Sequence, residues 1–183
     1  MKATQQLKDE HEGVRTMLRI LETICDKLEM AGNIDKEHFD GVLELLKVFV
    51  DKCHHGKEEE LLFPALVAAG VPEDGPIAVM LQEHETGRGY VRAMSHSYSS
   101  YMTGDRSSSK DILQNAHGYI GLLRDHIEKE NNVLFVMADD RLSEKKQDEL
   151  FAGFEKIEEE RIGVGKHEEY HGLIKRLSSI YSK

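Results

Sequence analysis

Apolar side chains recur at helical spacing along most of the chain. In the first segment, Leu18, Leu21, Ile24 and Leu28 follow one another at intervals of three or four residues. This spacing places them on one face of a helix. The pattern predicts a first helix that contains His11 and ends at residues 31–33, where a glycine and an asparagine interrupt it.

The same spacing predicts three further long helices. The chain contains only three prolines, so most of it is free to be helical. The expected helices run from about residue 35 to 69, from the break at 70–76 to about 101, and from a serine-rich loop at 107–111 to about 138. Because short connections force neighbouring helices to be antiparallel, we expect an all-α, antiparallel up-down four-helix bundle.

Two shorter helices are expected beyond this bundle. One covers about residues 143–161, and the other starts near Lys166, after a hinge at 163–165. This part has no counterpart in the internal repeat described next. We therefore expect a bundle domain over residues 1–140 and a C-terminal helical extension over residues 141–183 that packs on it.

A polar motif occurs twice inside the predicted helices. Each copy has a Glu-His-Glu triplet, followed 42 or 43 residues later by His-x-x-x-Glu. Residues four apart share one face of a helix, so the His and Glu of each pair can point at one spot inside the bundle. Four imidazoles and two carboxylates form a ligand set for two transition-metal ions, iron or manganese, with zinc possible. The predicted ligands are His11, His54, Glu58, His84, His126 and Glu130, with the two glutamates bridging.

The doublet His54-His55 leaves a second choice, because His55 also has a glutamate four residues later, Glu59. Glu58 lies five residues before a phenylalanine, as Glu130 does in the second half. The repeat therefore favours His54 with Glu58. It places His55 one step round the helix and outside the predicted ligand set.

These motifs resemble the hemerythrin-like family, also called the HHE cation-binding domain. The family pattern is His, His-x-x-x-Glu, His, His-x-x-x-Glu on four antiparallel helices, and the resemblance covers about residues 7–138. The flanks at 57–64 and 130–135 resemble bacterial members, including proteins that repair iron centres. The resemblance implies a non-haem di-iron centre bridged by two carboxylates and an oxo or hydroxo group. The family includes oxygen carriers, oxygen or redox sensors, iron sensors and nitric-oxide-linked repair proteins.

Two departures from the family pattern limit what the resemblance implies. Oxygen carriers of the family have a fifth histidine one turn after the third-helix ligand, where this chain has Arg88. We expect an open coordination position there, or a ligand from the tail such as His167 or His171. The repair proteins usually carry a cysteine-containing N-terminal segment, whereas this sequence starts at the first helix.

Residues beside the predicted ligands are candidates for tuning the centre. Glu10 and Glu83 directly precede ligands and are expected to accept a hydrogen bond from an imidazole, or else to face water. Arg15 and Arg88 occupy equivalent places. They are expected to pair with nearby carboxylates such as Glu12 and Glu85, or else one of them stabilises a bound anion. Tyr119 is expected either to pack in the core or to turn its hydroxyl toward the inner cavity.

Charge and composition narrow the functional classes. The net charge of -10 and the lack of a Lys/Arg run argue against nucleic acid as a partner. No stretch has the length and apolarity of a signal peptide or a membrane span. Two cysteines are too few for a disulfide framework, so a reduced, cytoplasmic setting is expected. We expect a protein that binds or reacts with O2, NO or peroxide; alternatives are an iron-handling protein that senses, stores or donates iron, and a bundle that metal only stabilises.

Overall fold

The described part of the chain, residues 2–181 of a computed structural model, is all-α and contains no β-strand. It begins with one long helix, α1 (Ala3–Ala31), and three further long helical stretches follow. In chain order the later elements are α2 (Lys36–Glu44), η1 (Leu45–His55), η2 (Glu58–Leu62), α3 (Phe63–Ala68), η3 (Glu73–Ile77), α4 (Ala78–Met102), η4 (Arg106–Ser108), α5 (Ser109–Lys129), η5 (Glu130–Leu134), α6 (Phe135–Arg141), α7 (Glu144–Arg161) and α8 (Lys166–Tyr181).

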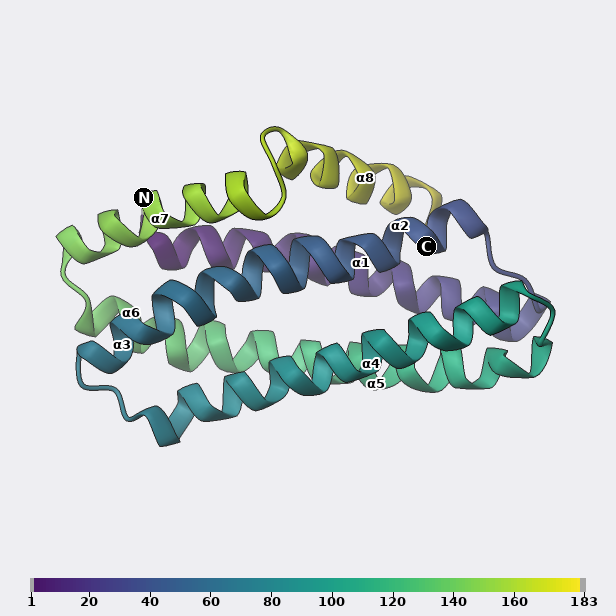
Figure 1. Ribbon diagram of the computed structural model, residues 1–183, viewed down its shortest axis with the longest axis horizontal. Coiled ribbons are helices and arrows are strands. Elements are labelled where there is room, and N and C mark those ends of the chain that lie inside the picture. Colours follow the sequence, from purple (N-terminus) through teal and green to yellow (C-terminus); the bar gives the residue numbers. More distant parts are fainter. Residues whose placement is uncertain (1, 182–183) are drawn as a thin grey trace.

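Four long helical stretches lie along the long axis of the molecule (Figure 1). They are α1, the continuous run at 36–68, α4, and the continuous run at 109–141. The stretch α5 packs against both α1 and α4, and η1 packs against α4 and α1. The segments η1, η2 and η5 are π-helical parts of otherwise regular helices. All three coincide with predicted metal-ligand positions.

Local capping explains how the first reversal forms. Gly32 has a positive φ of 64°, and its N–H donates to the carbonyl of Leu28 at 2.9 Å. A left-handed residue of this kind is a common helix stop, and glycine adopts it without steric cost. The carboxylate of Asp35 then accepts from the backbone N–H of His38 at 3.0 Å and starts α2.

The serine-rich loop is shorter than the sequence predicts. The Asp105 carboxylate accepts from the backbone N–H of Ser107 at 3.1 Å, and the chain turns helical at Arg106. The following helix starts at Ser109 and continues to Arg141, three residues beyond the expected end. The loop is short because Asp105 caps the chain at this point. Its carboxylate satisfies a backbone N–H group that would otherwise have no partner.

The core consists of two separate apolar clusters. On α1, Leu7 belongs to one cluster and Val14 to the other, and the buried pair Glu10 and His11 falls between them. Each of the other three long stretches also has buried polar residues between its parts of the two clusters. These polar residues lie near positions 54–58, 84 and 126–130. A polar layer therefore crosses the molecule between two apolar regions.

The helices α7 and α8 pack along α1, and both also contact η1 (Figure 1). Their buried side chains complete both apolar clusters. The turn between them lies at the predicted hinge, where Gly163 and Gly165 have positive φ values of 94° and 77°. The buried apolar residues of these helices are Leu150, Phe154, Ile157, Tyr170, Ile174, Leu177 and Tyr181.

None of the helices described between residues 2 and 181 combines the length and the apolar character that a membrane crossing requires.

We predict that shortening one tail side chain destabilises the whole protein. Leu177 is fully buried, so Leu177→Ala should lower the free energy of unfolding by about 2–5 kcal/mol. Ile180 lies on the same helix but is 46% exposed, so Ile180→Ala should change it by about 0.5 kcal/mol at most. Urea denaturation of the metal-free proteins measures both values. Equal effects of the two substitutions would show that α8 is not part of the core.

Candidate metal centre

The six predicted ligands converge in the buried polar layer. Two pairs of imidazoles face one another through their Nε2 atoms: His11 and His54 at 3.0 Å, and His84 and His126 at 3.1 Å. Each of the four long helical stretches contributes at least one residue. All six side chains are buried: His11, His54, Glu58, His84, His126 and Glu130.

The two glutamates lie between the imidazole pairs. Glu58 places one carboxylate oxygen 3.5 Å from His54 Nε2 and the other 3.5 Å from His84 Nε2. Glu130 places one oxygen 3.3 Å from His126 Nε2 and the other 3.1 Å from His11 Nε2. Each carboxylate thus reaches both imidazole pairs, as a bridging ligand does in two-metal bundle sites.

A seventh side chain, His55, joins this cluster, which corrects the expectation that it lies outside. His55 is buried, and its ring stacks on His84 with 3.8 Å between centroids. Potential ligand atoms of His55, His84, His126 and Glu58 lie within 4.8 Å of one another, and a second such group has His11, His54, Glu58 and Glu130.

The backbone that carries His54 and His55 differs from a regular α-helix, in which consecutive side chains are separated widely. The segment η1 ends at His55 and is π-helical, with hydrogen bonds five residues apart. A π segment has more residues per turn, so the angle between His54 and His55 is somewhat smaller than in a regular α-helix. Both side chains are buried in the polar layer. No local sequence signal marked this segment, although the His-His doublet itself was a hint.

Outer oxygen atoms hold the imidazoles in place. His54 Nδ1 lies 2.7 Å from the Glu10 carboxylate, and His126 Nδ1 lies 2.9 Å from that of Glu83. The prediction that these glutamates bind an imidazole is confirmed, and each binds the histidine of the neighbouring helix. The remaining two pairs are His84 with Glu59 at 2.7 Å and His11 with Asn131 at 2.9 Å. Such partners fix the ring orientation and leave Nε2 for a metal.

Burial leaves the centre of the cluster electrostatically unsatisfied. Within the described residues, none of the four oxygens of Glu58 and Glu130 has a hydrogen-bond partner of proper geometry, and neither has either ring nitrogen of His55. Burial, together with the neighbouring Glu130 carboxylate, raises the pKa of Glu58 well above its usual value. Burial lowers the pKa of His54 to about 4. Imidazoles and buried carboxylates without hydrogen-bond partners are the donor set that a divalent cation satisfies.

A buried lysine connects this cluster to the C-terminal helices. Lys57 Nζ donates to Glu10 at 2.5 Å and to Glu158 of α7 at 2.5 Å. Burial alone would raise the pKa of Glu10, but the hydrogen bond from His54 and the charge of Lys57 outweigh it and bring this pKa to about 2. A chain of contacts therefore runs from α7 through Lys57 and Glu10 to a predicted ligand.

The tail histidines do not reach the cluster, so they are not the missing ligand that the sequence analysis considered. His167 Nε2 lies 4.0 Å from Glu10 and 3.9 Å from Glu158, beside the lysine network. His171 meets the ring of His167 edge-on and contacts the ring of Phe49. Neither belongs to the two groups of potential ligand atoms that contain the predicted ligands.

The two equivalent arginines form ion pairs, as expected. Arg15 pairs with Glu12 at 2.7 Å and with Glu128 at 2.6 Å. The partners of Arg88 do not correspond to those of Arg15 in the repeat. Its main contacts are Asp51 at 2.8 Å and Glu59 at 2.7 Å, both on the neighbouring helix.

One surface cavity, of about 290 Å³, borders the cluster. His55, Arg88 and Tyr119 line it, together with Gly87, which packs against the Tyr119 ring. Of the seven cluster residues, His55 is the one in the cavity wall. Tyr119 is thus buried in the core and also borders the cavity.

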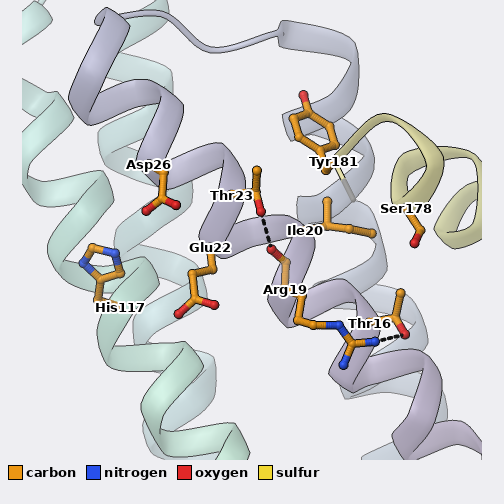
Figure 2. A pocket seen from close by; sticks show the side chains of 9 residues that line it. All are labelled: Thr16, Arg19, Ile20, Glu22, Thr23, Asp26, His117, Ser178 and Tyr181. Atoms are coloured by element: carbon orange, nitrogen blue, oxygen red, sulfur yellow. Dashed lines mark hydrogen bonds between the residues drawn. The ribbon is translucent and has the colours of Figure 1, made fainter. Parts of the chain in front are cut away.

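A larger cavity, of about 640 Å³, lies elsewhere, along α1 near α8. Figure 2 shows its walls, with Thr16 and Arg19 hydrogen-bonded along α1 and His117 opposite on α5. None of the seven cluster residues lines it. It is not a route to the candidate metal centre.

Comparison with known families agrees with this geometry. Residues 2–138 match the family described as the hemerythrin HHE cation-binding domain. The chain belongs to this family. The resemblance inferred from the spacing of six residues is therefore confirmed over three-quarters of the sequence.

Several curated bacterial proteins are similar to the chain over most of this region. They include the iron-sulfur cluster repair proteins YtfE of Escherichia coli O157:H7, E. coli K12/DH10B and Shigella boydii serotype 18. Each is 28% identical over 140 residues, which cover 70% of this chain and 64% of the relative. The chain thus matches under two thirds of the length of these relatives. No solved structure gives a significant match.

We predict that the buried lysine is required for stability. Lys57→Met removes the cation that Glu10 and Glu158 share and should lower the free energy of unfolding by about 3–5 kcal/mol, since it leaves the buried Glu10 carboxylate without its cation. The control is Lys52→Met, because Lys52 is exposed on the same helical run. Urea denaturation of the metal-free proteins measures the difference, and similar losses for both variants would contradict the prediction.

Proposed function

We propose that the chain is a non-haem di-iron protein of the hemerythrin type whose centre binds or reacts with O2, NO or peroxide. The observation that carries the proposal is the arrangement of the buried imidazoles in two groups that share two carboxylates. His11 and His54 would bind one ion, and His84 and His126 the other. Glu58 and Glu130 reach both groups and would bridge the ions.

Iron is the metal that the ligand types and the family support best. Mixed imidazole and carboxylate ligands suit iron or manganese, with zinc less favoured. The four long stretches would form the up-down bundle of this family, with the di-iron domain at residues 1–140 and the extension at 141–183. Cys25 and Cys53 are free and buried, which fits a reduced cytoplasmic setting.

Two iron ions bound here would supply redox chemistry toward a small molecule. The residues of the chain keep the ligands oriented for it: Glu10, Glu59 and Glu83 each accept a hydrogen bond from an imidazole. The apolar clusters on both sides exclude water from the layer. The cavity beside Arg88 and Tyr119 borders the centre, and His55 lies in its wall.

The alternative function is iron handling, meaning iron sensing, storage or donation for the repair of iron centres. It is supported by the relatives, which are named as iron-sulfur cluster repair proteins. The match covers 64% of their length, so their whole activity is only a proposal for this chain. Under this alternative, iron leaves the protein; under the first, iron stays while the small molecule reacts.

Metal analysis tests the di-iron proposal directly. Purified protein loaded anaerobically with Fe(II) should retain about two iron ions per chain after desalting. Oxidation should give near-ultraviolet charge-transfer absorption. Glu58→Gln removes one charge from the shared carboxylates and should reduce the iron retained, whereas Glu12→Gln, at an exposed position outside the cluster, should not. A folded wild-type protein that retains no iron would contradict the proposal.

A second experiment separates the two functions. The reduced, loaded protein is exposed to O2 or NO, while its spectrum and its iron content are both followed. A spectral change with iron retained supports small-molecule chemistry. Transfer of iron to a chelator or to an apo iron-sulfur protein, without such a change, supports iron handling.

Metal removal should destabilise the protein. A cation that binds only the folded state stabilises it by about 2.7 kcal/mol per site when its free concentration is about 100 times Kd. The buried oxygens of Glu58 and Glu130 also lack other partners. Thermal denaturation should therefore show a higher Tm with metal than with excess chelator. Coinciding melting curves would show that packing alone holds the layer together.

A further inference from the structure

The histidines of the cluster share one orientation. Four of them turn Nδ1 toward an oxygen outside the cluster, at distances of 2.7–2.9 Å. Their Nε2 atoms face one another in the centre. This is how a bundle presents imidazoles to metal ions, since the outer hydrogen bond fixes the tautomer.

His55 also turns Nδ1 toward an outer carboxylate, but at a longer distance and without a hydrogen bond. Its Nδ1 lies 3.5 Å from the carboxylate of Asp51, one helical turn earlier. This leaves Nε2 for the cluster, where Glu58, His84 and His126 provide the neighbouring ligand atoms. His55 is 4% exposed, and neither ring nitrogen has a hydrogen-bond partner of proper geometry within the described chain. A buried imidazole without such partners costs free energy unless a ligand uses it.

Arg88 supports this arrangement from outside. It donates to Asp51, which faces His55, and to Glu59, which binds His84. The guanidinium group thus holds the outer oxygen partners of both rings. The residue that stands in place of a fifth histidine ligand therefore positions two other histidines.

We propose that His55 is a fifth imidazole ligand and makes the two metal positions unequal. This inference rests on the proposed two-metal function. His55, His84 and His126 would hold one ion together with Glu58 and Glu130. His11 and His54 would hold the other ion with the same two carboxylates, so this ion would have one protein ligand fewer and could take a small molecule. His55 also stands between the 290 Å³ cavity and the ion that it would bind, and closes the centre on that side.

The number of ligating imidazoles can be counted in the wild-type protein. Loading with Co(II) shifts the Nδ1–H proton resonances of ligating histidines far outside the normal range, and these protons exchange with solvent. We expect five such resonances. A protein that binds two cobalt ions and shows four would overturn the role of His55 while leaving the two-metal proposal intact. A protein that binds no metal would instead contradict the proposed function.

Substitutions test the same point independently. His55→Phe keeps a ring to stack on His84 but cannot ligate, so one resonance should disappear and the second metal equivalent should bind more than about tenfold more weakly. His96→Phe, at an exposed position of α4, should change neither. Unchanged affinity for both ions in His55→Phe, with the helical circular dichroism intact, would overturn the proposal. If His55→Phe fails to fold, the wild-type resonance count decides alone.

Arg88→Met tests the positioning role of the arginine. It should keep all five resonances and both metal equivalents but move the His55 resonance, which its loss in His55→Phe identifies. The ion pair of Arg88 with Asp51 is the cause of the expected shift. An unmoved His55 resonance would show that Arg88 does not position this ring.

Discussion

The fold depends on a buried polar layer whose groups cannot satisfy one another. Glu58 and Glu130 bury four carboxylate oxygens without a proper hydrogen bond, and the imidazoles around them direct their Nε2 atoms inward. Burying such groups unpaired is costly, and only a cation satisfies all of them together. The apolar clusters on either side supply the stability that allows the layer to exist without metal.

The outer contacts decide how rigid this layer is. Glu10 and Glu83 each bind the histidine of a neighbouring helix, so the same bonds that orient the rings also join the helices in pairs. Lys57 extends one of these pairs to Glu158 on α7. A change in the packing of α7 would therefore alter the position of His54, because Lys57 and Glu10 connect the two. The C-terminal helices are part of the support of the centre, although they provide none of its candidate ligands.

Much of the fold could be predicted from the sequence, because helical spacing and turn residues are local signals. The stop at Gly32 and the turn at Gly163 and Gly165 are examples, since positive φ values favour glycine there. The convergence of six site residues followed from their repeated spacing. The sequence did not indicate the partners of Arg88, Asp51 and Glu59, because these depend on how two helices are rotated against each other.

The sequence repeat did not predict that His55 lies beside His84 and His126. Matching residues between two sequence repeats assumes that the second and fourth helical stretches have the same pitch. The second helix is π-helical up to His55, whereas the fourth becomes π-helical only at Glu130, four residues after His126. The two halves are therefore alike in sequence but different in backbone, and one presents an extra imidazole to the cluster. His55 lies beside His84 and His126, so the near-symmetric sequence places more imidazoles on one side of the polar layer than on the other.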